Sequence, residues 1–313
     1  MKKPRGLELL LALALDCVLG DPPAWPHPVK VMGHATSRLE TGARKHARGA
    51  ASETAAGIAV TVGVAGGSYV LARLMRRAAR PVEPLLLYTC MARRDLAQTA
   101  ARLAAALERE DLEDARHILP SLVGRDPSRM KAGDMARAGV ESVAENLVDG
   151  VLSPIFWAML GGAPGALAFK AVSTLDSMIG HRDDGFLYLG KCAARVDDAA
   201  NWLTARAAIP LITASSLVLG LDWRAAWQVG WADRKNHPSP NSAHPEAAFA
   251  GALALQLGGA DSYRDGVRSL PIIGKGGKPD AAHLRQAVTL MNATALLGAI
   301  GAFVVANLAV RRR

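Results

Sequence analysis

The stretch from Met135 to Pro154, MARAGVESVAENLVDGVLSP, sets acidic side chains at helical spacing immediately before an apolar segment. Glu141, Glu145 and Asp149 are each four residues apart, so a helix would stack the three carboxylates along one face. No Lys or Arg lies between Glu141 and Asp149 to offset the repulsion of these like charges. A cation bound by the carboxylates is one interpretation, and a solvated acidic face is the other.

The apolar segment that follows, residues 151–169, carries Gly161, Gly162, Pro164 and Gly165 in its middle. Glycine weakens a helix and proline removes a backbone donor from it. We therefore predict two half-helices joined by a break. Such a segment is re-entrant or buried in protein rather than a straight membrane span.

The composition predicts an all-α, polytopic membrane protein with several transmembrane or re-entrant helices and one polar helical block. Of its 313 residues, 50% are hydrophobic and only 5% aromatic, which is too apolar for a routine soluble enzyme. The spanning candidates are residues 55–75, 203–221 and 286–310. Residues 7–19 are too short to cross a hydrocarbon core of about 30 Å. We predict one integral membrane domain over residues 1–313, with the polar block at about residues 92–150.

The positive charge of the chain, formally +9, lies beside the apolar runs. The polar block from Met91 to Gly150 holds 11 acidic and 9 basic residues, so it is not a basic surface and nucleic acid is not an expected partner. The excess sits at Lys2, Lys3, Arg5, Arg73, Arg76, Arg77, Arg80 and Arg311 to Arg313. This pattern sets membrane orientation and predicts that the end of the segment at residues 55–75 faces the cytoplasm.

Several polar motifs lie outside the acidic stretch. The proline-rich segment at residues 20–29 can present Asp21 and His27 rigidly, or can simply end a helix with an incidental histidine. Asp197 and Asn201 are four residues apart with Asp198 beside them, which suits either Mg²⁺ with bound phosphate or a solvated helix start. Ser239 and Asn241 can cap a helix starting near Pro245, where an anion could also bind.

Taken in order, these motifs resemble the CobD/CbiB family of cobalamin-biosynthesis membrane proteins, the adenosylcobinamide-phosphate synthases. The resemblance covers residues 16–33 (DCVLGDPPAWPHPVKVMG), 92–96, 123–126, 140–154, 161–180, 194–202 (ARVDDAANW) and 239–253 (SPNSAHPEAAFAGAL). The chain departs from the family pattern at Ser173, Thr204, His244 and Glu246 while keeping the acidic positions. Ordered motifs over most of a chain are a specific signal.

The resemblance implies an ATP-dependent ligase that joins a carboxylate of adenosylcobyric acid to the amine of an aminopropanol phosphate, with ATP as co-substrate and Mg²⁺ as cofactor. The amine stays open between aminopropanol, its phosphate, threonine phosphate and ethanolamine phosphate. The implied location is the cell inner membrane, among its lipids, with the active site facing the cytoplasm. The oligomeric state is open, and a homo-oligomer is one of the alternatives.

Phosphoryl transfer to a carboxylate needs Mg²⁺, carboxylates to hold it and cations on the phosphates. Under the resemblance, the metal ligands are Glu141, Glu145, Asp149, Asp197 and Asp198. The groups that bind phosphate or substrate are Lys170, Arg94, Arg125, Arg195, Ser239 and Asn241. Asp176 is the candidate base for the attacking ammonium, with His27 as second choice.

Two other functions suit parts of the pattern. A non-catalytic membrane sensor of the AmpE type would share the architecture, but it would have no need of the acidic set together with Lys170. A Mg²⁺-dependent membrane prenyltransferase would use aspartates on a diphosphate, but it predicts two equivalent DDxxD-like motifs. The chain has only one partial match, at Asp197 and Asp198.

Overall fold

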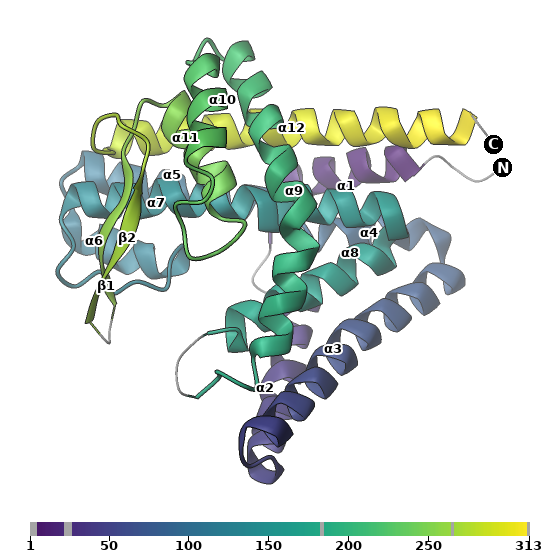
Figure 1. The fold of residues 1–313 in the computed structure, drawn as a ribbon. Helices are drawn as coiled ribbons and strands as arrows, with labels where there is room; N and C mark the ends of the chain where they lie inside the picture. Colours follow the sequence, from purple (N-terminus) through teal and green to yellow (C-terminus); the bar gives the residue numbers. More distant parts are fainter. Residues whose placement is uncertain (1–4, 22–26, 182–184, 264–265, 312–313) are drawn as a thin grey trace. The chain divides into compact units, whose positions relative to one another are not determined.

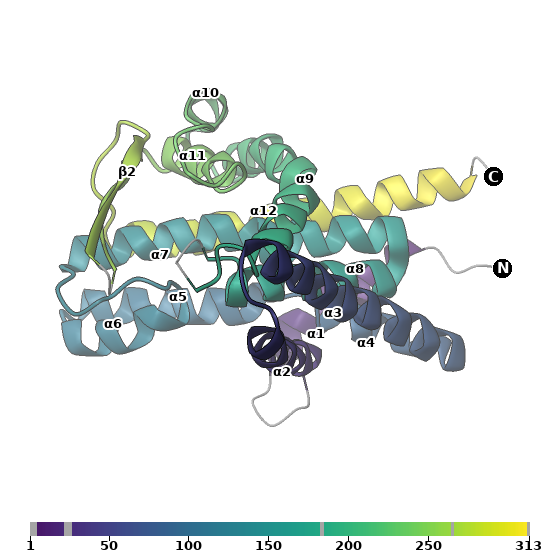
Figure 2. The ribbon, with the colours of Figure 1, turned by 60° about the horizontal axis from the view of Figure 1, so that its bottom comes forward.

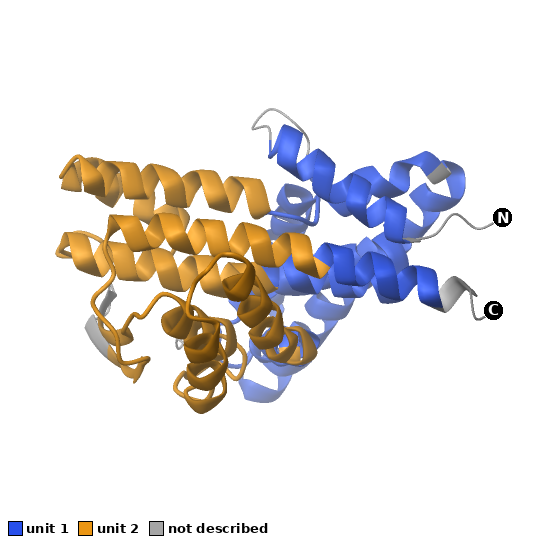
Figure 3. Cartoon of the chain, turned by 90° about the horizontal axis from the view of Figure 1, so that it is seen from above, with its two compact units in different colours: residues 1–92, 149–201, 299–313 blue, residues 93–148, 202–298 orange. Residues whose placement is uncertain are grey.

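The computed structural model describes residues 5–21, 27–181, 185–263 and 266–311 (Figure 1). The chain divides into two compact units, shown in Figure 3. Unit 1 comprises residues 1–92, 149–201 and 299–313, and unit 2 comprises residues 93–148 and 202–298. That the two units together form one domain over residues 1–313 remains a prediction.

Unit 1 is helical and has α8 in its core. Its elements are α1 (Arg5–Leu19), α2 (Pro28–His46), α3 (Ala50–Ala78), η1 (Arg80–Val82), α4 (Glu83–Tyr88), most of the π-helical turn η3 (Val148–Leu152), α8 (Ser153–Ile179), the start of α9 (Lys191–Val218) and the end of α12 (Ala281–Arg311). Helix α8 packs against α2, α3 and α4. Buried residues recur along it, from Ile155 to Ile179.

Unit 2 contains the polar helical block and a small hairpin. Its elements are α5 (Arg93–Glu108), α6 (Leu112–Ile118), η2 (Leu119–Ser121), α7 (Ala132–Leu147), the rest of α9, α10 (Trp223–Ala232), α11 (Ala243–Ala252), β1 (Leu257–Tyr263), β2 (Gly266–Ile273) and the first part of α12. Helices α10 and α11 lie side by side in Figures 1 and 2, and α11 also packs on α7. The antiparallel strands pair from Leu257 with Ile273 to Tyr263 with Gly266, and they contact α7 and α11.

The predicted helical membrane protein is confirmed. Three helical segments are long and apolar enough to cross a membrane, namely Ala50–Ala78, Ala132–Ile179 and Ala281–Leu308. The apolar part of Ala132–Ile179 is mostly buried within the protein, in agreement with the expectation that residues 151–169 are not a straight span facing lipid. The predicted span at residues 203–221 is not among these three segments, because α9 ends at Val218 and its apolar part is shorter than predicted.

The predicted break in α8 is confirmed at Gly162, where the backbone leaves the helical region with φ 68° and ψ −160°. The second half-helix therefore starts with unsatisfied N–H groups. Glu83, whose side chain is only 4% exposed, accepts a hydrogen bond from Ala163 N at 3.3 Å through Oε1. Its Oε2 pairs with Arg76 Nε at 2.6 Å. A buried carboxylate thus caps the half-helix, and an arginine of the same unit balances its charge.

Gly162→Ala is expected to lower the free energy of unfolding by about 1–3 kcal/mol, because alanine strains the positive φ. Its Cβ would also lie 2.6 Å from Glu83 Oε1. Gly161→Ala is the matched control, since a Cβ there meets nothing within 4 Å. Denaturant unfolding of both purified variants in the same detergent measures the difference, and equal stabilities would contradict this account of the break.

Candidate functional site

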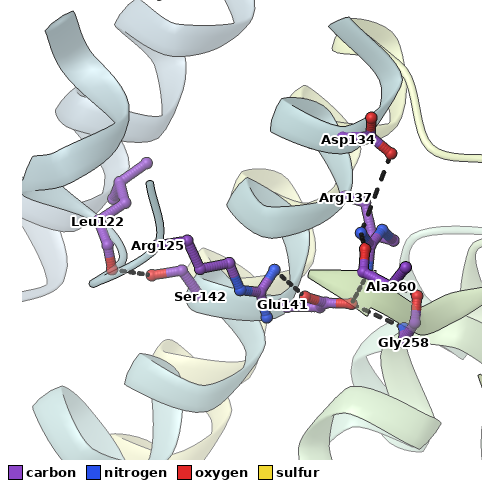
Figure 4. A network of polar contacts seen from close by, with 8 residues as sticks. All are labelled: Leu122, Arg125, Asp134, Arg137, Glu141, Ser142, Gly258 and Ala260. Atoms are coloured by element: carbon purple, nitrogen blue, oxygen red, sulfur yellow. Dashed lines mark hydrogen bonds and ion pairs between the residues drawn. The ribbon is translucent and has the colours of Figure 1, made fainter. Parts of the chain in front are cut away.

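Glu141, on α7 of unit 2, is a buried carboxylate held by two arginines. Its Oε2 lies 2.5 Å from Arg125 Nη1, and its Oε1 accepts a hydrogen bond from Gly258 N at 2.7 Å (Figure 4). Arg137 Nη1 lies 3.6 Å from the same Oε1 and donates to Gly258 O at 2.5 Å. Arg137 Nη2 donates to Ala260 O at 2.9 Å. The positive charges that the acidic stretch lacks between Glu141 and Asp149 therefore come from a distant loop and from the preceding helical turn.

The loop that carries Arg125 is fixed against α7 by a second contact. Ser142, the neighbour of Glu141, donates its hydroxyl to Leu122 O at 2.8 Å. Within the loop, Asp126 Oδ1 accepts a hydrogen bond from Ser128 N at 3.0 Å and closes a turn. The loop is thus docked on α7, which directs Arg125 toward the carboxylate.

Glu145 faces the loop that joins α10 to α11. Ser242 Oγ donates to Glu145 Oε1 at 2.7 Å. His237 lies in the same loop, and its Nδ1 accepts a hydrogen bond from Ser239 N at 3.0 Å, which places the proton of the neutral ring on Nε2. Burial lowers the pKa of His237, while the nearby charges of Glu145 and Glu141 act in the opposite direction. Arg125, Arg137, Glu141, Glu145, His237 and Ser242 are called the unit 2 cluster below.

The unit 2 cluster contains three groups that the sequence did not single out. Arg137 belongs to the acidic stretch itself, while His237 and Ser242 lie in or just before the motif at residues 239–253. A signal for Arg137 was available, because it precedes Glu141 by four residues, which is salt-bridge spacing on a helix. No comparable local signal links residue 237 to Glu145, because the effect of one charge on the other depends on how α11 packs on α7.

In the described ranges, no three His, Cys, Asp or Glu side chains lie close enough to hold a metal ion by themselves. Mg²⁺ needs no such group when a substrate supplies phosphate oxygens, because one or two carboxylates and water complete its shell. The side chains of Glu141 and Glu145 fit such a Mg²⁺ site, since both are carboxylates. Glu145, which accepts a hydroxyl hydrogen bond, has a less saturated carboxylate than Glu141, which contacts two guanidinium groups.

Asp197, Asn201 and Ser153 form a hydrogen-bonded chain in unit 1. The predicted helix over residues 194–202 is confirmed as part of α9. Asn201 Nδ2 donates to Asp197 Oδ2 at 2.9 Å, and Ser153 Oγ donates to Asn201 Oδ1 at 2.5 Å. Asn201 therefore orients the Asp197 carboxylate, rather than acting as an independent second ligand. A spacing of four residues on a helix allows either this hydrogen bond or a pair of metal ligands, so the spacing alone does not distinguish the two.

A cavity of about 360 Å³ in unit 1 brings two further predicted residues together. Arg195 and Asp198 line it, with His181, Tyr188 and Lys191. Gly180 also lines the cavity, and a Cβ on this glycine would overlap Oδ1 of Asp176, so the candidate base lies behind the cavity wall. Two basic side chains and an acid around a space of this size suit a small phosphorylated molecule.

Lys170 lies on the second half of α8 and is half-buried. Across the described residues its ammonium forms no ion pair, with Asp176 or with any other carboxylate. It lies near the Cys90 thiol, whose pKa burial raises to about 12, with Lys170 acting in the opposite direction. Cys90 is therefore an inert buried thiol, and the ammonium is available to an anion.

The remaining predicted residues are His27, Asp149 and Arg94. His27 is the N-cap of α2, since its Nδ1 accepts a hydrogen bond from Val29 N at 3.3 Å and its Nε2 lies 3.4 Å from Asp21 Oδ1. Asp149 lies in η3, where the i→i+5 pattern interrupts the four-residue spacing from Glu145. Arg94 is half-buried on α5. The predicted stack therefore does not continue regularly beyond Glu145.

The expected capping of α11 needs a correction. The helix starts at Ala243 rather than near Pro245, and its N-cap residue is Ser242, whose side chain makes no capping hydrogen bond. Ser239 Oγ instead accepts from the backbone N–H groups of Asn241 and Ser242, both at 3.3 Å. Ser239 thus stabilises the turn before the helix, because a hydroxyl can bond backbone donors two and three residues on.

The predicted acidic set is divided between the two units. Unit 2 holds Glu141 and Glu145, which it brings together with the predicted Arg125. Unit 1 holds the four aspartates, and the predicted Lys170, Arg195 and His27. These aspartates are Asp149, Asp176, Asp197 and Asp198.

His244, on α11, is expected to make the protein less stable in acid. It is 3% exposed, and burial first, then the positive charge of Arg206, lower its pKa from 6.5 to about 4. Between these two values the unfolded chain binds the proton more readily, so the free energy of unfolding falls as the pH is lowered, by about 3 kcal/mol over the window. Thermal unfolding of His244→Gln and of the unchanged protein at several pH values measures it. An unaltered pH dependence in the variant would exclude His244 as the cause.

Comparison with known proteins identifies the family. The family described as CobD/Cbib protein matches residues 9–291. The chain belongs to the CobD/CbiB family. Among its CobD/CbiB relatives, "Cobalamin biosynthesis protein CobD" of Geobacter metallireducens is 42% identical over 91% of this chain and 92% of the relative. The protein of the same name from Listeria monocytogenes serovar 1/2a is 41% identical over 85% and 86%. "Cobalamin biosynthesis protein CbiB" of Salmonella typhi is 41% identical over 82% and 83%.

The CobD/CbiB match includes every candidate site residue in both units, from His27 to Asn241. It ends at residue 291, within α12. No solved structure matches the chain.

Proposed function

We propose that this protein is an ATP-dependent ligase that joins adenosylcobyric acid to aminopropanol phosphate, giving adenosylcobinamide phosphate. The observation that supports the proposal is the CobD/CbiB match over residues 9–291, with relatives named cobalamin biosynthesis proteins. Membership of this family supports a role in cobalamin biosynthesis. The ligation step and its substrates are our proposal.

The proposed reaction has two steps, because an amine does not displace oxygen from a carboxylate at neutral pH. In the first step a carboxylate oxygen of the corrinoid takes the γ-phosphoryl group of ATP, and ADP leaves. In the second step the amine nitrogen attacks the acyl carbon, the bond from that carbon to the phosphate oxygen breaks, and inorganic phosphate leaves. The nitrogen loses a proton, which we assign to the Asp176 carboxylate beside Gly180.

The phosphates need cations that no carboxylate already neutralises. Lys170 meets this requirement, and Arg195 lines the unit 1 cavity beside Asp198. Mg²⁺, when bound, would neutralise charge on the transferring phosphoryl group. We propose Asp149, Asp197 and Asp198 as carboxylates that can hold it in unit 1 and, separately, Glu145 as one that can hold it in unit 2. Arg125 is less suited to phosphate because it pairs with Glu141. We place this chemistry at the cytoplasmic side of the inner membrane, where ATP is available.

The test is an assay of the purified full-length chain in detergent with adenosylcobyric acid, ATP and Mg²⁺. Each amine is supplied in turn: aminopropanol, its phosphate, threonine phosphate and ethanolamine phosphate. The expected result is a new amide product, detected by mass, with ADP and inorganic phosphate in equal amounts and only when corrinoid and amine are both present. Folded protein that forms no amide and no ADP with any of the four amines would overturn the proposal.

Lys170→Met is expected to weaken the apparent affinity for ATP or for the aminoalcohol phosphate by roughly tenfold or more, because one charge-assisted contact to phosphate is lost. Expression and folding should be retained, since the ammonium has no ion pair to break in the described part of the chain. The measurement is KM for each substrate in turn, with Lys170→Arg as the charge-conserving control. A folded variant with unchanged KM values would show that Lys170 does not bind phosphate.

A further inference from the structure

Arg206 and Arg234 of unit 2 are close enough for their charges to interact, and within the described ranges their side chains hydrogen-bond to neutral groups. Arg206, on α9, donates to Trp202 O at 2.7 Å and to Asn241 Oδ1 at 3.2 Å. Its guanidinium carbon lies 4.2 Å from the centre of the Trp202 ring. Arg234, in the loop after α10, donates to Trp231 O and lies 5.4 Å from the centre of the Trp231 ring.

Neither arginine is paired with a carboxylate in the part of the chain that the structure describes. The pKa of Arg206 is lowered, first by burial and second by the positive charge of Arg234. Two partly buried like charges repel each other. Stacking on indole rings stabilises each cation, but it does not remove this repulsion. An anion bound between the two guanidinium groups would remove the repulsion.

Two buried nitrogens of the same region lack a hydrogen-bond partner among the described residues. They are His244 Nδ1 and Trp231 Nε1. His244 is 3% exposed, and the charges of both arginines lower its pKa. The indole nitrogen belongs to the ring beside Arg234. Buried nitrogens of this kind normally bond protein, water or an ion, so their presence beside an arginine pair is a second and independent sign of a missing acceptor.

We propose that Arg206 and Arg234, with Asn241 and His244, bind a phosphate group. Phosphate suits the set because a guanidinium donates two parallel hydrogen bonds to its oxygens. The sequence did not single out either arginine, and the inference goes beyond the proposed reaction because it concerns binding alone. The phosphate belongs either to a soluble ester or to a lipid headgroup. Exposed Trp202, Trp223 and Trp227 in the same unit are the kind of side chain that lies at a membrane surface.

Isothermal titration of inorganic phosphate into the full chain, in an uncharged detergent and without ATP or corrinoid, tests the site directly. We expect Arg206→Gln and Arg234→Gln each to weaken binding roughly tenfold or more, and Arg206→Lys to weaken it less. Arg224→Gln is the matched control. Arg224 is exposed on α10 and lies 5.2 Å from the centre of the Trp223 ring, so it shares the indole contact but not the burial of Arg206. The Arg224→Gln variant should therefore bind inorganic phosphate as tightly as the unchanged protein.

The lipid arm repeats the titration in nanodiscs of phosphatidylcholine with and without phosphatidylglycerol. If the occupant is a headgroup, phosphatidylglycerol suppresses phosphate binding in the unchanged protein, and the glutamine variants retain less phosphatidylglycerol on purification. If the occupant is a soluble ester, phosphatidylglycerol has no effect. Binding as tight in folded Arg206→Gln and Arg234→Gln as in the unchanged protein would overturn the proposal, as would an equal loss in Arg224→Gln. Failure here leaves the ligase proposal intact, because no turnover is measured.

Discussion

Glu141→Gln is expected to lower the free energy of unfolding by about 3–5 kcal/mol, since it removes the charged partner of a buried pair and leaves the other charge uncompensated. The carboxylate is 5% exposed and touches both Arg125 and Arg137, which are themselves nearly buried. Glutamine keeps the shape and can still accept from Gly258 N. The loss is therefore one of charge, and denaturant unfolding of the purified variant measures it.

Two comparisons separate this effect from a general sensitivity of α7. Asp134→Asn removes another carboxylate near Arg137, but that carboxylate is 3.9 Å away and 48% exposed, so we expect it to change stability by about 0–1 kcal/mol. The double variant Arg125→Met with Glu141→Leu should recover much of the loss, because it removes both charges together. A double variant as unstable as the sum of its two single variants would contradict the charge account.

The elements that were predicted correctly are those whose cause is local. The break in α8 follows from Gly162 and Pro164 themselves, and helix α3 follows from an uninterrupted apolar run. The hairpin of β1 and β2 was not predicted, because its strands lack clear alternation of apolar and polar residues. Its order depends on tertiary contacts with α7 and α11. Local periodicity carries no information about such contacts.

In the candidate site too, the local features were predicted from the sequence and the tertiary contacts were not. The spacing of Glu141 and Glu145 correctly placed both on a helix, but it did not reveal that a loop 16 residues upstream brings Arg125 to the first of them. Neighbours in sequence alone do not show the basic residues that offset these charges, because Arg125 reaches Glu141 only through the fold. Arg206 and Arg234 were missed for the same reason, because each looks like an ordinary surface arginine until α9 and the loop after α10 are seen to bring them together.

Glu145→Gln is expected to give a folded protein whose amide formation is lower by at least about 100-fold, the scale on which one preorganised electrostatic contact acts in a transition state. The carboxylate is half-buried, and its hydrogen bond from Ser242 is one that glutamine can also accept, so little stability should be lost. A neutral amide oxygen, however, is a poorer ligand for Mg²⁺ than a carboxylate. The measurement is kcat and KM for ATP over a range of Mg²⁺ concentrations.

The comparison with Glu141→Gln makes this prediction specific to the role of Glu145. The two residues are one helical turn apart and both act on His237, yet we expect the first variant to lose stability and the second to lose turnover. Higher Mg²⁺ should restore part of the activity of Glu145→Gln if the lost contact was to the metal, and Asp149→Asn should behave in the same way. Turnover equal to that of the unchanged protein, in folded Glu145→Gln, would remove Glu145 from metal binding and leave its contact with Ser242 as a purely structural link between α7 and α11.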